Sequence, residues 1–162
     1  MGAFSMLNML SSALVVGPSP LGRGLITEQA LEIGDVALKV PMSTAIGVDR
    51  NGELPWLLRL TMRLVEETAK GGTSAYAQYI RTLPKQPHRL LQWSDEELEL
   101  LQNNSLAEVA AERRSERSAD FMTVSQEMPL LRRADFYWAY DLVCSRTVGV
   151  RGGRLLLLPQ AL

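Results

Sequence analysis

Glycines and arginines at two places in this sequence have the types and spacing to hold a small ligand. Gly22-Arg23-Gly24-Leu25 brackets one residue with two glycines, and glycine tolerates positive φ and lets backbone N–H and C=O groups approach a ligand closely. The spacing predicts a tight backbone turn that admits a ligand, with a plain turn between strands as the alternative. Arg146, next to Ser145, is the second candidate, because a guanidinium keeps its charge and offers fixed donors to a carboxylate. The helix macrodipole also favours a cation at such a helix end.

Other kinds of chemistry find little support in the residue types. Cys144 is the only cysteine and His88 the only histidine of the sequence. Neither an internal disulfide nor a Cys/His zinc site is therefore predicted. We expect Cys144 to be packed in the core and His88 to be a solvent-facing loop residue. No phosphate-binding loop or dinucleotide-binding glycine motif occurs. The tryptophans are expected to pack in the core and at a helix cap rather than form a cage for a methylated ligand: Trp56, Trp93 and Trp138.

The composition is that of one soluble globular domain. The 162 residues are 46% hydrophobic and 22% charged, with a formal net charge of −1, so no global field draws nucleic acid or an anionic membrane. Residues 1–16 contain no Lys or Arg, unlike a secretory or organellar leader, and are too short to span a bilayer. A single cysteine fits a reducing compartment, and the cytoplasm and the chloroplast both stay open as locations.

Strands are predicted near both ends of the chain. The segment 25–41 predicts two short strands joined by a polar turn at residues 32–35, with Pro41 ending the second strand. A loop carrying Asn51-Gly52 follows. Near the other end, Gly152-Gly153 predicts a turn into residues 155–158, a continuous apolar run typical of a buried strand.

Helices are predicted through the middle of the chain. Residues 54–70 carry a broad apolar stripe and stop at Gly71-Gly72, and residues 74–81 form a shorter candidate. Trp93-Ser94-Asp95-Glu96-Glu97-Leu98 has the spacing of a capping box and a hydrophobic staple. Residues 106–118 predict a solvated helix whose charges form an exposed face, and Asp135 is expected to cap a last helix that ends at Arg146.

A strand hairpin, a long run of helices and a final strand predict an α+β protein. The order of several motifs resembles the SET-domain protein methyltransferases of the Rubisco large-subunit lysine methyltransferase type. The matching motifs are Gly22-Arg23-Gly24-Leu25, Gly34-Asp35, Val40-Pro41, Tyr79-Ile80, Leu83-Pro84, Trp93-Ser94 with Glu96-Glu97-Leu98, Trp138-Ala139, Ser145-Arg146 and Leu158-Pro159. The resemblance implies a loose start over 1–12, an N-terminal SET β portion over 13–53, a helical insertion over 54–147 and the start of the C-terminal SET portion over 148–162. The SET core would be incomplete.

The resemblance also implies a cofactor, S-adenosyl-L-methionine, and the residues that lie against it. In the family, the glycine segment contacts this cofactor through its backbone, which carries over to Leu21, Gly22, Arg23, Gly24 and Leu25. Leu21 stands where many members have a glutamate, so a carboxylate contact there is lost. Arg146 matches an arginine beside the cofactor. No metal site is implied.

The family pattern is interrupted after Leu158-Pro159. There the family has an Asp, then an Asn-His pair and later a catalytic Tyr, whereas this chain has Gln160-Ala161-Leu162. The resemblance therefore implies part of a methyltransferase that acts on a protein lysine, or on a histidine, and that is inactive as this isolated chain, with no catalytic residue of its own. The oligomeric state stays open.

Two alternatives stay open beside this interpretation. One is a non-catalytic protein-interaction module, in which the strand at 155–158 would be left at an open sheet edge and need a partner. The other is an unrelated α+β domain whose motif order is a coincidence.

Overall fold

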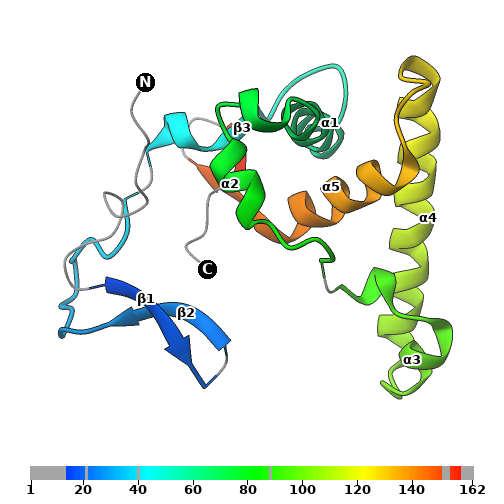
Figure 1. Cartoon of the computed structure of the whole chain (residues 1–162). Coiled ribbons are helices and arrows are strands. Elements are labelled where there is room, and N and C mark those ends of the chain that lie inside the picture. The colour runs from blue at the N-terminus through cyan, green and yellow to red at the C-terminus, as the bar shows by residue number, and fades with distance from the viewer. Residues whose placement is uncertain (1–13, 21, 40, 88, 151–153, 158–162) are drawn as a thin grey trace.

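The structure is a computed structural model of the whole chain and describes residues 14–20, 22–39, 41–87, 89–150 and 154–157. It mixes helices with short antiparallel strands, which confirms the predicted α+β class (Figure 1). In chain order the elements are β1 (Leu14–Ser19), β2 (Gly22–Thr27), the 3-10 turn η2 (Met42–Thr44), β3 (Ile46–Asp49), α1 (Trp56–Ala69), η3 (Gly71–Thr73), α2 (Ala77–Thr82), η4 (Leu90–Gln92), α3 (Asp95–Glu99), α4 (Asn104–Glu127), α5 (Arg133–Arg146), β4 (Thr147–Val150) and β5 (Arg154–Leu157).

The first hairpin lies earlier in the chain than the sequence predicts. β1 pairs antiparallel with β2, from Leu14 opposite Thr27 to Ser19 opposite Gly22. The polar turn at 32–35 does form, with Gly34 at φ 104° and the Asp35 carboxylate accepting from Glu32 N at 2.8 Å. Residues 28–37, however, form no strand, so the predicted hairpin over 25–41 is wrong. The two prolines and three glycines of residues 17–24 make this stretch look like a loop in the sequence. Proline is nevertheless tolerated on an edge strand.

The second sheet joins segments that are far apart in the sequence. Its order is β3-β5-β4 with antiparallel pairing throughout, and Ile46 lies opposite Leu157. The predicted last strand is confirmed at residues 154–157, while Leu158 and Gly152-Gly153 lie outside the described residues. β5 is the central strand, so the expectation that it is left at an open edge is wrong.

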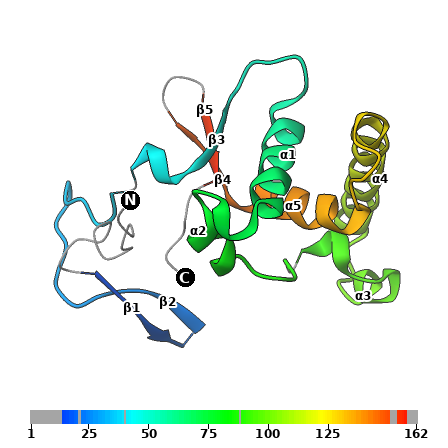
Figure 2. The ribbon, with the colours of Figure 1, turned by 45° about the horizontal axis from the view of Figure 1, so that its top comes forward.

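Helix α5 is at the centre of the hydrophobic core. One face of it packs with α1, α2 and β3 around the fully buried residues Ile46, Leu60, Leu64, Ala139, Leu142 and Val143. A second cluster joins α1, α4 and α5 through Leu58, Phe121, Val124, Phe136 and Tyr140. Figures 1 and 2 show α1 and α4 on either side of α5, with the β1–β2 hairpin apart from these helices. Burial of each large apolar side chain is worth about 1.5–3 kcal/mol.

Local signals set the end of α1 and the start of α3, whereas the limits of α4 and α5 differ from those predicted. α1 ends before Gly71, whose φ of 55° is the left-handed conformation that glycine supplies at a helix end. Ser94 and Glu97 form the predicted capping box. α4 is longer than predicted: Asn103 caps it, and it runs on to Glu127. α5 begins at Arg133 rather than at an Asp135 cap.

Candidate functional site

The predicted ligand-binding glycine segment is an extended strand and not a tight turn. Gly22, Arg23, Gly24 and Leu25 are consecutive residues of β2. The described glycines with positive φ are Gly34 and Gly71 alone, so neither glycine of the segment needs that freedom for its backbone. Leu21 lies outside the described residues.

β2 nevertheless offers backbone groups to a ligand. In the described part of the chain β2 pairs with β1 alone, and a strand with one neighbour presents N–H and C=O groups along its other edge. A side chain added at Gly24 would meet nothing within 4 Å, whereas one added at Gly17, its partner across the hairpin, would meet the Ile26 side chain at 3.0 Å. Among the described residues, nothing fills the space at the Cβ position of Gly24.

Arg146 is the last residue of α5 and lies just before β4. The carbonyls of the last turn are taken up locally: Ser145 Oγ donates to Leu142 O at 3.0 Å, and Thr147 Oγ1 donates to Val143 O at 2.7 Å. Arg146 is partly buried. Its charge acts on the phenol of Tyr79, a residue of α2: burial raises the pKa of Tyr79 well above its usual range, and Arg146 partly opposes that shift.

The described structure does not bring these two predicted elements together. β2 belongs to the hairpin, which Figures 1 and 2 both draw apart from the end of α5. Each element keeps its own features, a free strand edge in one case and a cation at a helix end in the other. The described residues thus contain two separated parts of the predicted site.

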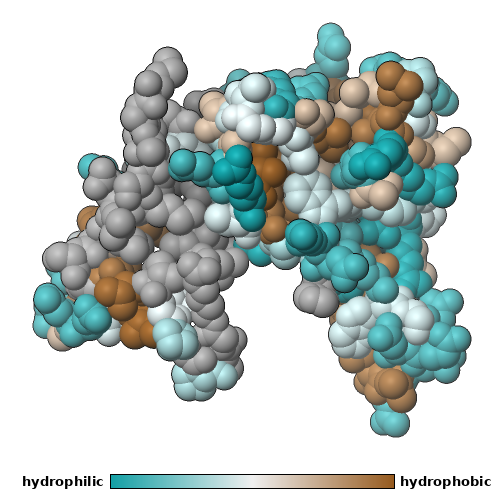
Figure 3. Space-filling model, in the orientation of Figure 1, coloured by the Kyte–Doolittle hydropathy of each residue, from teal (hydrophilic) through white to brown (hydrophobic). Residues whose placement is uncertain are grey.

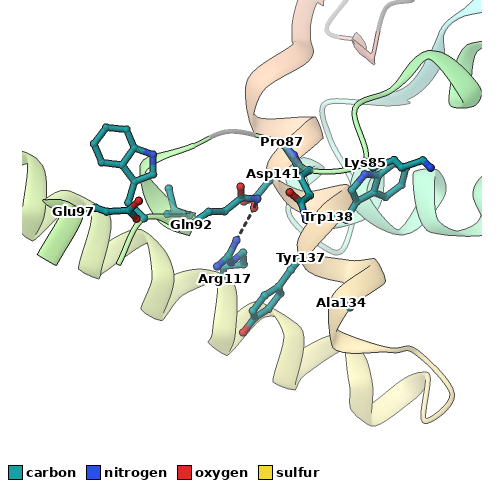
Figure 4. Close-up of a pocket in the computed structure, with 12 residues that line it drawn as sticks. Lys85, Pro87, Gln92, Glu97, Arg117, Ala134, Tyr137, Trp138 and Asp141 are labelled. Carbon is teal, nitrogen blue, oxygen red and sulfur yellow. Dashed lines mark hydrogen bonds and ion pairs between the residues drawn. The ribbon is translucent and has the colours of Figure 1, made fainter. Parts of the chain in front are cut away.

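A buried ion pair lies elsewhere, beside a cavity of about 570 Å³. The cavity lies between the segment 85–97 and helices α4 and α5, and Figure 4 shows Arg117 and Asp141 beside Tyr137 and Trp138. Arg117 Nη1 donates to Asp141 Oδ2 at 2.7 Å, and Gln92 Nε2 donates to the same oxygen at 3.1 Å. The Arg117 guanidinium also lies 4.1 Å from the centroid of the Tyr137 ring.

This ion pair corrects one prediction and shows a missed signal. The charge run of residues 106–118 is predicted to form an exposed face, but one of its cations, Arg117, is only 7% exposed. The signal was Asp141, the one acidic residue within the apolar run 136–144 of α5, because a carboxylate there must have a buried partner. Periodicity alone could not say which cation reaches it.

The structure also places the residues for which the sequence predicts no ligand-binding or catalytic role. Cys144 is exposed, so the prediction that it is packed in the core is wrong. Partial desolvation still raises the pKa of its thiol, and a hydrogen bond from Arg89 opposes this shift. Trp138 packs against the core and donates to Pro84 O at 2.9 Å, while Trp93 is 37% exposed. Among the described residues there is no group of three or more His, Cys, Asp or Glu side chains that could hold a metal ion. His88 lies outside that part of the chain.

No helix within the described ranges is both long and apolar enough to cross a membrane. The longest, α4, has 24 residues and is rich in charged side chains.

The architecture is that of a SET domain, present in part. Two solved structures carry this comparison: the SET domain of LSMT bound to lysine and AdoHcy, with a TM-score of 0.79 and 22% identity, and Rubisco LSMT bound to AdoMet, with a TM-score of 0.78 and 22% identity. The first covers 96% of this chain and 41% of the solved chain, and the second covers 94% and 40%. The incomplete SET fold predicted from the sequence is confirmed, and the unrelated α+β domain is excluded.

Comparison of the sequence with characterised proteins gives two relatives of one kind. The chain is 26% identical over 165 residues to the ribulose-1,5 bisphosphate carboxylase/oxygenase large subunit N-methyltransferase of Nicotiana tabacum, covering 90% of this chain and 33% of that protein. It is 25% identical over 162 residues to the [fructose-bisphosphate aldolase]-lysine N-methyltransferase of Arabidopsis thaliana, covering 88% and 33%. No family model matches. The predicted resemblance to SET-domain protein lysine methyltransferases is confirmed, and the chain spans about a third of the length of these relatives.

Proposed function

We propose that this chain is part of an S-adenosylmethionine-dependent protein-lysine N-methyltransferase. The observation that carries the proposal is the match of 96% of the chain to a solved SET domain, together with relatives that are N-methyltransferases. Residues 13–53 would supply the N-terminal SET β portion, 54–147 the helical insertion and 148–162 the start of the C-terminal SET portion, after a loose start over 1–12. Histidine is the alternative acceptor.

The proposed cofactor contacts divide between the two separated elements. The open edge of β2 would contact the cofactor through the backbone of residues 21–25. The Arg146 guanidinium would pair with the methionyl carboxylate, for which a permanently charged, multidentate donor is well suited. The bound cofactor supplies a sulfonium methyl group for in-line transfer to a deprotonated amine. The described residues would orient the cofactor rather than move protons, since holding the reacting groups in line lowers the barrier.

We further propose that the 162 residues alone transfer no methyl group. The Asn-His pair and the tyrosine that the resemblance implies after Leu158-Pro159 are not among them. In such enzymes those groups would complete the electrostatic environment of the reacting amine. The protein substrate would likewise be selected in part by residues beyond these.

The test is a calorimetric titration of the 162-residue chain with S-adenosylmethionine, with Arg146→Ala as control, together with a transfer assay using labelled cofactor and protein substrates. We expect weak binding that Arg146→Ala reduces by about tenfold or more, since a charged hydrogen bond is worth about 1.5–3 kcal/mol. We expect no labelled protein. Measurable transfer would overturn the inactivity, and binding that is unchanged by Arg146→Ala would overturn the role of that residue.

A non-catalytic protein-interaction module is the second candidate, favoured by apolar side chains exposed where α3 meets α4. Leu100 is 82% exposed, Leu106 41% and Val109 49%, and the last two lie one turn apart on α4. A partner would cover them. Sedimentation of the chain beside its Leu106→Glu variant tests this idea, because self-association that the variant abolishes would support an interaction surface, and two identical monomers would count against one.

A further inference from the structure

The hydroxyl of Tyr79 is a buried polar group with no partner in the described part of the chain. Tyr79 is 7% exposed, and its Oη makes no hydrogen bond within the described residues. Taking a hydroxyl out of water without a partner is unfavourable. The ring alone would serve the packing, since Tyr79 belongs to the larger core cluster with Leu83 and Leu142, and phenylalanine would fill that space without the cost. The hydroxyl therefore needs an explanation of its own.

The geometry of α5 places Arg146 on the helix face that packs in the cluster of Tyr79. Ala139, Leu142 and Val143 are fully buried on the face of α5 that packs in the same cluster as Tyr79. Arg146 follows Ala139 by seven residues, Leu142 by four and Val143 by three, so it continues the same face one turn on. The electrostatic effect of Arg146 on the Tyr79 phenol agrees with this arrangement. One face of the helix therefore carries the guanidinium toward Tyr79.

The two groups suit the same kind of ligand. The phenol is protonated at neutral pH, as tyrosine ordinarily is, and burial raises its pKa further, so it is a neutral donor. The guanidinium is a charged donor with several N–H groups. A carboxylate accepts hydrogen bonds at both of its oxygens and in several directions, so it can receive donors from α2 and from α5 at once.

We propose that Tyr79 is a second binding residue for the methionyl carboxylate of the cofactor, its hydroxyl donating to one carboxylate oxygen while Arg146 binds the other. This inference rests on the proposed function. It adds a residue of the helical insertion to the cofactor site, so the insertion would contact the methyl donor directly. The bound carboxylate provides the partner that Tyr79 lacks in the described structure.

The test compares two ligands on the 162-residue chain and on Tyr79→Phe, which keeps the ring and removes the oxygen. Calorimetry with S-adenosylhomocysteine should show affinity about tenfold lower in the variant, the loss of one hydrogen bond to a charged group. The decarboxylated analogue of the same ligand should bind both proteins equally. Tyr76→Phe is the matched control, a partly buried tyrosine against the same cluster, and it should change neither affinity.

The possible outcomes separate the two proposals. Equal affinity of wild type and Tyr79→Phe for S-adenosylhomocysteine would overturn the inference alone, as would an equal loss for both ligands, which signals packing. A wild-type chain that binds neither ligand would overturn the proposed cofactor site and this inference with it. If Tyr79→Phe fails to fold, wild type labelled with ¹³C at tyrosine Cζ serves instead. The Tyr79 resonance should shift with S-adenosylhomocysteine and not with the analogue, and no shift would overturn the inference.

Discussion

The N-terminal hairpin with its connecting segment and the helical body differ sharply in how they bury side chains. The residues whose side chains are described as buried lie between Ala45 and Val143. In the segment that precedes the body, Ile33 and Val36 are exposed, at 107% and 67%, and Figure 3 shows hydrophobic side chains on the visible face of the hairpin. A two-stranded hairpin is marginally stable alone. The body thus has its own core, whereas the hairpin depends on strand pairing.

The largest effect should come from the buried ion pair of the body. In Asp141→Ala the Arg117 charge stays buried without its carboxylate, so we expect unfolding to become easier by about 3–5 kcal/mol. Urea denaturation followed by circular dichroism measures this. Asp135→Ala removes the exposed ion pair with Arg132 and should cost at most about 1 kcal/mol. Equal losses in the two variants would mean that burial does not decide the strength of ion pairs here.

The next largest loss of stability should come from a cavity created in the core. Leu142 is fully buried in the larger cluster, and Leu142→Ala should lower the free energy of unfolding by about 3 kcal/mol through lost burial and an unfilled space. Val36→Ala, in the connecting segment, should change it by less than about 0.5 kcal/mol. The same denaturation experiment compares them, and a large effect of Val36→Ala would show that the segment packs against something.

The helices were predictable because their signals are local, and β5 was predictable from its continuous apolar run, whereas β1 and β3 were not. Periodicity and Gly71 define α1, and Ser94 with Glu97 starts α3. β3 is four residues long and gains its strand character by pairing with β5, more than a hundred residues further along the chain. Such pairing leaves no trace in four residues. The first hairpin was missed for a related reason. Its glycines and prolines are typical of loops, and only the pairing of β1 with β2 makes these residues strands.

The candidate site divides along the same line. The position of Arg146 at a helix end was predictable, because α5 is set by its own periodicity and ends there. The conformation of Gly22 to Leu25 was not, because two glycines permit both a turn and a strand and the pairing with β1 decides between them. In the sequence, Tyr79 stood out only as part of the Tyr79-Ile80 motif. Its buried hydroxyl is a property of the packed core.

A smaller, pH-dependent effect should come from Glu67 in the body. Hydrogen bonds from Lys70 at 2.6 Å and Ser74 at 2.7 Å lower the pKa of this carboxyl, against the opposing effect of burial. A lowered folded pKa stabilises the protein above the unfolded pKa of about 4.3, and the contribution is lost as the pH falls through the folded pKa. Glu67→Gln should cost about 1.5 kcal/mol at pH 7.

Denaturation of wild type and Glu67→Gln at a series of pH values measures this effect. The difference in free energy of unfolding between the two proteins should shrink as the pH falls below the pKa of the unfolded carboxyl. Glu66→Gln, at an exposed neighbouring position, should show no such dependence. A difference that stays constant down to acid pH would mean that the ionised carboxylate is not the stabilising form.

The smallest effect gives the most direct comparison of the two regions, because it makes the same change in each. Gly34 and Gly71 both have positive φ, 104° and 55°, and a methyl group at either would meet nothing within 4 Å. Alanine in the left-handed conformation costs about 1–2 kcal/mol. Gly71→Ala strains the end of α1, which the core holds, so the whole body should unfold more easily by about 1 kcal/mol. At Gly34 the backbone is the more strained of the two for alanine, yet the turn can relax without disturbing the core, so Gly34→Ala should leave the thermal midpoint unchanged. Calorimetric melting decides between them, and a midpoint lowered equally by both variants would show that the turn and the body unfold as one unit.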